Sequence, residues 1–137
     1  MAEAFEFPVR IYYEDTDAGG VVFYANYLKF FERARTEWLR SAGISQHDMS
    51  ERHGVMFVVR ETSVDFRAPA RLDDLLTLRS RIERLGRVAV VFHQEAWRHS
   101  AGRDELLATS VIKVGCVDRA TFRPTAIPDD VRQALKT

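Results

Sequence analysis

Residues 14–20 place three carboxylates and two glycines within seven consecutive positions, in the order Glu-Asp-Thr-Asp-Ala-Gly-Gly. A run of mostly apolar and aromatic residues, from Val21 to Tyr27, follows at once. These residue types could bind a divalent cation through oxygen atoms, present one catalytic carboxylate, or form a solvated turn. Gly19 and Gly20 would suit an active loop, because residues without Cβ atoms let a substrate approach the backbone closely. The residues themselves leave these alternatives open.

The metal-binding interpretation is the least supported of the three. The spacing of Glu14, Asp15 and Asp17 does not match an EF-hand loop, and no distant His or Cys completes a recognisable ligand set. The four histidines lack zinc-site spacing, and Cys116 has no neighbouring base that would make it a nucleophile. We therefore expect neither a metal ion nor another cofactor. Asp15 is then either a solvated turn acid or a residue that orients the loop by bonding backbone N–H groups.

The composition is that of an ordinary globular chain. Its 137 residues suffice for one sizeable core, so we expect a single domain over residues 1–137. Twenty basic residues balance twenty acidic ones, which does not favour nucleic acid or an anionic membrane as the main partner. No signal peptide and no 18-residue apolar run is visible, so we expect no membrane span. A single cysteine cannot form an internal disulfide, and the expected location is cytoplasmic.

The acidic loop must be positioned by the elements on either side of it. Before the loop, residues 8–13 alternate as in a strand, with Tyr13 on the same side as Val9. After the loop, from about Asn26, the apolar period becomes helical. The apolar positions then recur at steps of three and four residues: Tyr27, Phe30, Phe31, Ala34, Trp38 and Leu39. Gly43 is well placed to end this long helix in a left-handed conformation.

Strand-like segments fill most of the remaining chain. They span residues 57–66, 75–82, 87–97 and 105–117. In the first segment Val58, Val64 and Phe66 are in phase, residues 45–54 form a polar connection, and the tail after Pro128 is a short helix at best. One helix cannot cover both faces of a five-stranded antiparallel sheet. We therefore predict an α+β fold in which a curved sheet wraps around one long central helix, with its outer face or edge available for subunit contact.

A resemblance to the hotdog-fold acyl-CoA thioesterases lies in the stretch Y-Y-E-D-T-D-A-G-G-V-V-F-Y-A-N-Y-L-K-F-F-E-R-A-R-T-E-W-L. The stretch is most similar to the Tol-Pal-associated group and to the wider 4-hydroxybenzoyl-CoA thioesterase family. The similarity covers almost the whole chain, through F-V-V-R-E-T-S-V-D-F-R-A-P-A-R-L-D-D-L-L to A-I-P. It implies the hotdog fold, and it implies homodimers, often paired into homotetramers, with active sites at the subunit interfaces.

The resemblance also assigns roles to individual residues. Asp17 matches the family's catalytic carboxylate, and the backbone N–H of Tyr24 matches the group that binds the thioester oxygen. Members of the Tol-Pal group usually carry His at the position of Tyr24, whereas the 4-hydroxybenzoyl branch carries an aromatic residue there. Asn26 could bond the loop or cap the helix, and Arg87, in a basic run around a turn, either belongs to a solvated face or meets the phosphates of CoA, as basic residues of relatives in the same turn imply. The residues expected to bind substrate are Gly19, Gly20, Val21, Asn26 and Arg87.

These roles suit the hydrolysis of a thioester. The leaving thiol has a pKa of roughly 8.5, so no strong general acid is needed to expel it. Asp17 would act as a nucleophile or as a general base for water, and the helix N-terminus would bind the oxyanion. The expected substrate is an acyl-CoA, or an acyl carrier protein thioester in its place. Two alternatives are a hotdog dehydratase, which would need a His near residues 17–27, and a non-catalytic module that binds acyl thioesters.

Overall fold

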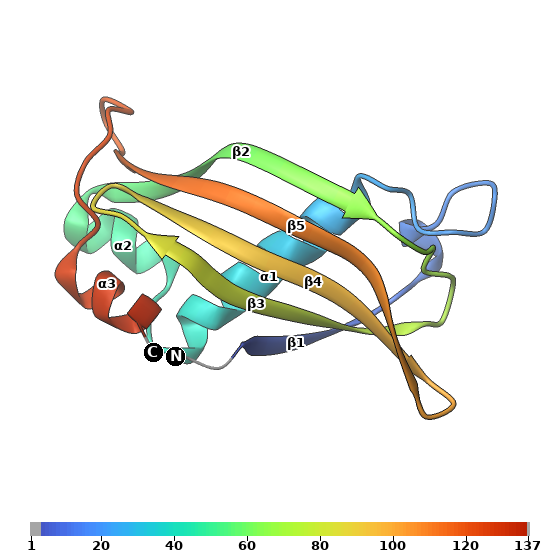
Figure 1. Ribbon diagram of the computed structural model, residues 1–137. Coiled ribbons are helices and arrows are strands. Elements are labelled where there is room, and N and C mark those ends of the chain that lie inside the picture. The colour runs from blue at the N-terminus through green and yellow to red at the C-terminus, as the bar shows by residue number, and fades with distance from the viewer. Residues whose placement is uncertain (1–3, 137) are drawn as a thin grey trace.

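Five antiparallel strands form one curved sheet around a long helix, α1 (Asn26–Ser41) (Figure 1). This computed structural model describes residues 4–136. The strand order is β1-β3-β4-β5-β2, and every neighbouring pair is antiparallel. The predicted α+β fold is confirmed. The other elements are β1 (Phe5–Arg10), the 3-10 helix η1 (Tyr13–Asp15), α2 (Gln46–His53), β2 (Val55–Phe66), β3 (Leu75–Leu85), β4 (Ala89–Ser100), β5 (Arg103–Asp118) and α3 (Asp129–Lys136).

The core lies between α1 and the concave face of the sheet. All six apolar positions predicted for the inner side of the helix are buried, and Phe30, Phe31 and Ala34 are completely inaccessible. The facing strands contribute inward rows of the same kind: Leu76 and Leu78 of β3, Val90 and Phe92 of β4, Ile112 and Val114 of β5. Burial of these side chains fixes the helix across the sheet. Within residues 4–136, no helix is long and apolar enough to cross a bilayer.

A polar network also ties α1 to the sheet. The amide of Gln94, which is fully buried in β4, donates to the carbonyl of Phe31 at 2.9 Å and to the hydroxyl of Ser80 at 2.8 Å. Its oxygen accepts a hydrogen bond from the guanidinium of Arg35 at 2.9 Å. Burial lowers the pKa of Arg35 to about 10, so the group remains charged at neutral pH. Every buried polar group in this network has a partner, which is the condition for tolerating it in a core.

Three local expectations were wrong. The first strand ends at Arg10, and Tyr13 lies in η1 with 80% of its surface exposed, because the backbone turns at Tyr12. Val58 and Val64 do not share a face, because a β-bulge between Val59 and Glu61 shifts the register of β2 against β5. The polar connection at 45–54 is helix α2, which Ser45 caps by accepting the N–H of Asp48 at 2.9 Å.

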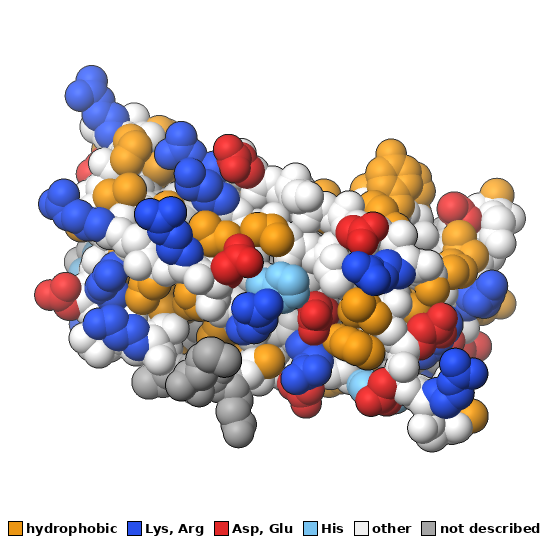
Figure 2. All heavy atoms as spheres, in the orientation of Figure 1, with side chains coloured by type: hydrophobic (Ala, Val, Ile, Leu, Met, Phe, Trp, Pro, Cys, Tyr) orange, Lys and Arg blue, Asp and Glu red, His pale blue; other side chains and the backbone are white. Residues whose placement is uncertain are grey.

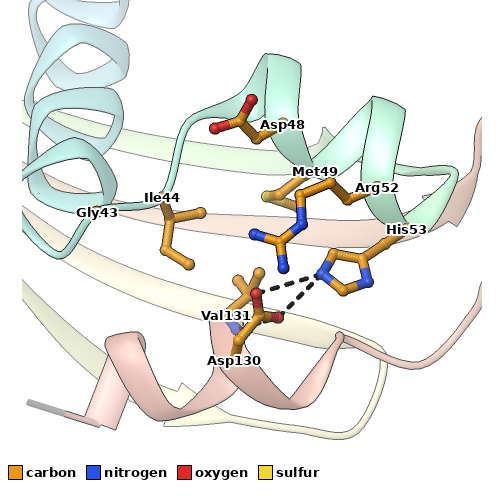
Figure 3. Close-up of a pocket in the computed structure, with 8 residues that line it drawn as sticks. All are labelled: Gly43, Ile44, Asp48, Met49, Arg52, His53, Asp130 and Val131. Atoms are coloured by element: carbon orange, nitrogen blue, oxygen red, sulfur yellow. Dashed lines mark hydrogen bonds and ion pairs between the residues drawn. The ribbon is translucent and has the colours of Figure 1, made fainter.

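Helices α2 and α3 meet at one end of the sheet, far from the acidic loop (Figure 1). His53 Nε2 lies 3.1 Å from Asp130 Oδ1, and the two side chains point toward each other across a small hollow (Figure 3). Burial opposes ionisation of Asp130, but its hydrogen bonds with His53 and with the N–H of Val131 keep its pKa below the usual value. The hollow encloses only about 10 Å³, enough for roughly one water molecule. The contact between His53 and Asp130 anchors the C-terminal helix α3, and the hollow beside it is too small for a substrate.

Gly43 ends α1 as predicted, with φ at +82° and with the N–H of Ile44 bonded to the carbonyl of Leu39 at 2.9 Å. A Cβ at this position would meet no atom within 4 Å, so substitution has only a conformational cost. We expect Gly43→Ala to lower the free energy of unfolding by about 1 kcal/mol. Gly43→Asn should cost less, because Asn tolerates the left-handed region. Urea unfolding measures both variants, and equal losses would contradict the conformational explanation.

Candidate active site

The acidic loop is a tight hairpin between Thr16 and Val22, which form an isolated antiparallel bridge. Inside it the N–H of Asp17 donates to the carbonyl of Val21 at 2.9 Å, and the N–H of Gly20 donates back to the carbonyl of Asp17 at 3.0 Å. Gly20 has a φ of +78°, which a three-residue hairpin loop of this type requires at its last position. The glycine therefore serves the turn itself, whatever else the loop does.

Asp17 presents its carboxylate at the exposed side of this hairpin. Its Oδ1 accepts the N–H of Gly19 at 2.8 Å, which fixes the orientation of the side chain. A Cβ at Gly19 would lie 3.2 Å from that same oxygen, so a larger residue would crowd the carboxylate. Within residues 4–136 the other oxygen, Oδ2, has no partner. The turn thus holds one oxygen and leaves the other available for chemistry.

The start of α1 provides two free hydrogen-bond donors. Asn26, Tyr27 and Leu28 each donate a backbone hydrogen bond to the residue three positions earlier, at 2.8, 3.3 and 3.2 Å. The first unpaired N–H groups are therefore those of Tyr24 and Ala25, for which the described part of the chain offers no acceptor. Such groups, together with the positive end of the helix dipole, favour a bound anion or a developing negative charge.

Asp15 joins the hairpin to the start of the helix. It is only 9% exposed, so the interpretation as a solvated turn acid was wrong. Its Oδ2 accepts the N–H of Tyr12 at 2.8 Å. Its carbonyl oxygen accepts two further bonds, each of 2.9 Å, from the N–H of Phe23 and from the side-chain amide of Asn26. Asn26 therefore bonds the loop and does not cap the helix.

Residues 67–74, which connect β2 to β3, support the hairpin that carries Asp17 by a backbone hydrogen bond. The carbonyl of Ala70 accepts the N–H of Val22 at 2.9 Å. Arg98 holds this connection in place by donating to the carbonyl of Pro69 at 3.0 Å and to Asp74 Oδ2 at 2.9 Å. A further hydrogen bond from Arg98 to Glu105, followed by the bond to Asp74, raises the pKa of the guanidinium. The role of Arg98 was not predicted, because nothing near it in the sequence indicates contacts with residues 29 and 24 positions away.

An open pocket of about 290 Å³ lies beside the free donors at the helix start. Tyr27 forms part of its wall, and burial raises the pKa of its phenol. The rings of Tyr24 and Tyr27 both meet Phe66 edge-on, with centroids 6.1 and 5.5 Å apart. The residues that line the pocket are Val22, Tyr24, Tyr27, Phe66, Arg67, Ala68 and Pro69. The contribution of residues 66–69 was not foreseen, because the contact of this segment with α1, which includes the hydrogen bond from the Ala70 N–H to the Tyr27 hydroxyl at 3.3 Å, joins residues 43 positions apart.

Arg87 lies apart from the other predicted site residues. It sits in the turn between β3 and β4, at the end of the sheet opposite the acidic loop (Figure 1). Figure 2 shows Lys and Arg side chains gathered on that side of the molecule. A pocket of about 300 Å³ there is lined by Arg84, Arg87 and Lys113, none of which forms an ion pair among residues 4–136. One chain thus brings together Asp17, Gly19, Gly20, Val21, Tyr24 and Asn26, and it does not bring Arg87 to them.

The described residues contain no group of three His, Cys, Asp or Glu side chains arranged to hold a metal ion. At the loop and the start of α1 the chain offers a carboxylate, that of Asp17, and the unpaired backbone N–H donors. A carboxylate can attack an electrophilic carbon or take a proton from water, and the donors can stabilise an oxyanion.

Comparison with known proteins identifies the family of the chain. The model of the family described as the thioesterase superfamily matches residues 19–103. The acyl-CoA thioester hydrolase YbgC of Escherichia coli is 46% identical to this chain over 133 residues, which is 96% of each of the two chains. The acyl-CoA thioesterase YbgC of Haemophilus influenzae is 42% identical over 135 residues, which is 98% of this chain and 96% of the Haemophilus protein. The crystal structure of a 4-hydroxybenzoyl-CoA thioesterase with 4-hydroxybenzoyl-CoA, 21% identical, superposes with a TM-score of 0.89 over 98% of this chain and 99% of that one, which shows a shared fold. The chain belongs to the thioesterase superfamily.

Proposed function

We propose that this protein hydrolyses acyl-CoA thioesters, with Asp17 as the attacking or water-activating group and the N–H of Tyr24 as the oxyanion donor. The observation that carries the proposal is the pairing of two features on one short segment. An exposed carboxylate with one free oxygen lies seven residues before the first unpaired N–H of a helix. Both YbgC relatives are named as acyl-CoA thioester hydrolases, which supports the same reaction.

The arrangement meets the two demands of thioester cleavage. The carbonyl carbon needs an oxygen nucleophile, which Asp17 supplies directly or by taking a proton from water. The carbonyl oxygen becomes negatively charged in the tetrahedral intermediate, and the unpaired N–H groups of Tyr24 and Ala25 can stabilise it. Because these donors belong to the backbone, they need no particular side chain at position 24, so Tyr is tolerable there in place of the His that members of the Tol-Pal group usually carry. The aromatic pocket beside Tyr24 would then receive the acyl group.

The alternatives have less support. A dehydratase of this fold would need a histidine at the site, and residues 14–28 contain none. A non-catalytic module would bind acyl-CoA without releasing thiol. An acyl carrier protein thioester offers the same reacting group, so we keep it as a second possible substrate. The single Cys116, buried and not in a disulfide, is consistent with action in the cytoplasm.

We further propose that the protein acts as a dimer or a larger homo-oligomer. Strand β2 forms one edge of the sheet (Figure 1), and over its twelve residues it offers unpaired backbone groups on its outer side. Apolar side chains of this strand are exposed, with Val59 at 54% and Phe66 at 47%. Such an edge is a template for pairing with another strand, and a second copy of β2 satisfies it.

Oligomerisation also gives Arg87 a role. Strand β3 has eleven residues and so separates the loop from the basic pocket by about 35 Å. A substrate at Asp17 would therefore meet the basic pocket of a neighbouring subunit. Three cations around one pocket, none of which has an ion-pair partner in the described part of the chain, suit the phosphates of CoA.

Asp17→Asn keeps an oxygen for the N–H of Gly19 but removes the nucleophile or base. We expect it to lower kcat for acyl-CoA hydrolysis by about 10²–10⁴-fold. Thiol release from short, long and aromatic acyl-CoAs measures the effect and the substrate preference together. The exposed neighbour Glu14 provides a matched control, and Glu14→Gln should retain activity. Full activity of Asp17→Asn would disprove the assignment, and tight binding of acyl-CoA by wild type without turnover would favour the non-catalytic module.

Val59→Lys should disrupt oligomers, because a lysine on an edge strand opposes strand pairing. Val111→Lys is the matched control, since Val111 is similarly exposed but lies on β5, inside the sheet. Light scattering after size exclusion measures the mass of each. We expect monomers for the first variant and dimers or larger assemblies for the second. An unchanged mass for Val59→Lys would rule out the β2 edge as the dimer contact.

Arg87→Glu should raise KM for acyl-CoA about tenfold or more, because a charge-assisted hydrogen bond to phosphate is lost and a repulsion replaces it. The same variant should treat an acyl-N-acetylcysteamine thioester, which has no phosphate, as wild type does. Arg103→Glu changes the net charge equally at the other end of β4 and serves as control. Equal effects of Arg87→Glu on both substrates would exclude a phosphate contact.

A further inference from the structure

Asp15 is a buried carboxylate to which the proposed reaction gives no role. Burying a charged group is unfavourable unless its contacts compensate, and among the described residues its side chain has one partner, the N–H of Tyr12 at 2.8 Å. No cation pairs with it in that part of the chain. A buried carboxylate without a counterion is costly, so its presence here calls for a structural or functional explanation.

The contacts of Asp15 bring three segments to one point. Its carboxylate holds the chain where it leaves β1, because Tyr12 follows directly after Ile11, whose N–H donates to the carbonyl of Asp74 at 2.9 Å. Its carbonyl holds the N–H of Phe23 and the amide of Asn26, both at 2.9 Å. The first anchor is the bond from Tyr12 to the Asp15 carboxylate, and the second is the pair of bonds from Phe23 and Asn26 to the Asp15 carbonyl. The hairpin that carries Asp17 lies in the chain between Asp15 and Phe23.

The bond to Phe23 matters most for geometry. The N–H groups of Val22 and Phe23 are fixed by the carbonyls of Ala70 and Asp15, each at 2.9 Å. The next N–H along the chain, that of Tyr24, is the first free donor, so its direction follows from the two that are fixed before it. A shift of Asp15 would move the hairpin and this donor relative to each other.

We propose that the Asp15 side chain is a positioning group for thioester hydrolysis: by accepting the Tyr12 N–H it holds in place the Asp15 backbone carbonyl, which accepts from Phe23 and Asn26 and so sets Asp17 and the Tyr24 N–H in register. This inference rests on the proposed function. It assigns the effect to a hydrogen-bond acceptor and not to the negative charge, because the one bond that the side chain makes, from the Tyr12 N–H, needs only an oxygen atom.

Four variants test the proposal by steady-state kinetics and amide hydrogen exchange. Asp15→Ala should lower kcat about 10²-fold with little change in KM, because misplacement of reacting groups acts on the chemical step. Asp15→Asn keeps an acceptor oxygen and should restore most of kcat with an unchanged pH profile. Asn26→Ala, which cuts the second anchor and keeps a good helix former, should also lower kcat. Asp118→Ala removes a comparable acceptor of two backbone N–H groups, those of Ala120 and Thr121 at the far end of β5, and should leave kcat unaltered.

The amide exchange readout separates this inference from the proposed function. Faster exchange of the Phe23 and Gly20 amides in Asp15→Ala supports the positioning role even if wild type hydrolyses no thioester, in which case the proposed function fails alone. Wild-type kcat in Asp15→Ala, or in Asn26→Ala should Asp15→Ala not fold, overturns the inference. Equal losses in Asp15→Asn and Asp15→Ala overturn it as well, since the charge would then be what matters.

Discussion

An α-helix cannot pair its own first N–H groups, and in this chain the start of α1 leaves those of Tyr24 and Ala25 unsatisfied by any acceptor within residues 4–136. Leu28, three residues after the N-cap Ala25, has no side-chain oxygen to accept the Ala25 N–H, and Ala25 has none to form a cap, whereas Ser45 caps the neighbouring helix α2 in the usual way. The contrast shows that a cap is available to this fold and is not used at α1. The open helix end is the feature around which the loop, the pocket and the sheet are arranged.

The rest of the structure holds this end in place without closing it. The inner side of α1 is buried against β3, β4 and β5, so the helix cannot slide along the sheet. The Asp17 hairpin approaches the helix start through the carbonyl of Asp15, and the connection between β2 and β3 supports it from behind through Ala70. Arg98 ties that connection to β4. A carboxylate and a pair of donors are thereby kept close to an aromatic pocket, and thioester hydrolysis is the reaction we propose for them.

The sequence predicts the parts of the fold that depend on periodicity. Helix α1 was predicted at its first residue and on all six buried positions, because large apolar side chains at steps of three and four leave few other arrangements. Helix α2 was missed, because Met49 is its only buried residue and its remaining positions are polar, so no apolar period marks it. The phase of β2 was misjudged, because a bulge is set by pairing with β5 and leaves no sign in the strand's own residues.

The candidate site divides in the same way. The Asp17 loop was singled out by its residue types and given a catalytic role by the family resemblance, since both lie in one short stretch, and that role stays a prediction. Asp15 is buried because the chain turns sharply around it, and Arg98 reaches the loop because the fold brings distant segments together. Residue types alone indicate neither. Arg87 stays a prediction, because its place at the far end of the sheet gives it a substrate contact only in an assembly.

The central claim is that the carbonyl oxygen of the substrate binds at the start of α1. A crystal structure of Asp17→Asn with a non-hydrolysable acyl-CoA analogue, in which a methylene replaces the thioester sulfur, tests it most directly. We predict the analogue's carbonyl oxygen within about 3.2 Å of the Tyr24 backbone nitrogen, with the acyl group in the aromatic pocket. A carbonyl oxygen bound elsewhere, with the Tyr24 N–H still unpaired or donating to water, would contradict the account.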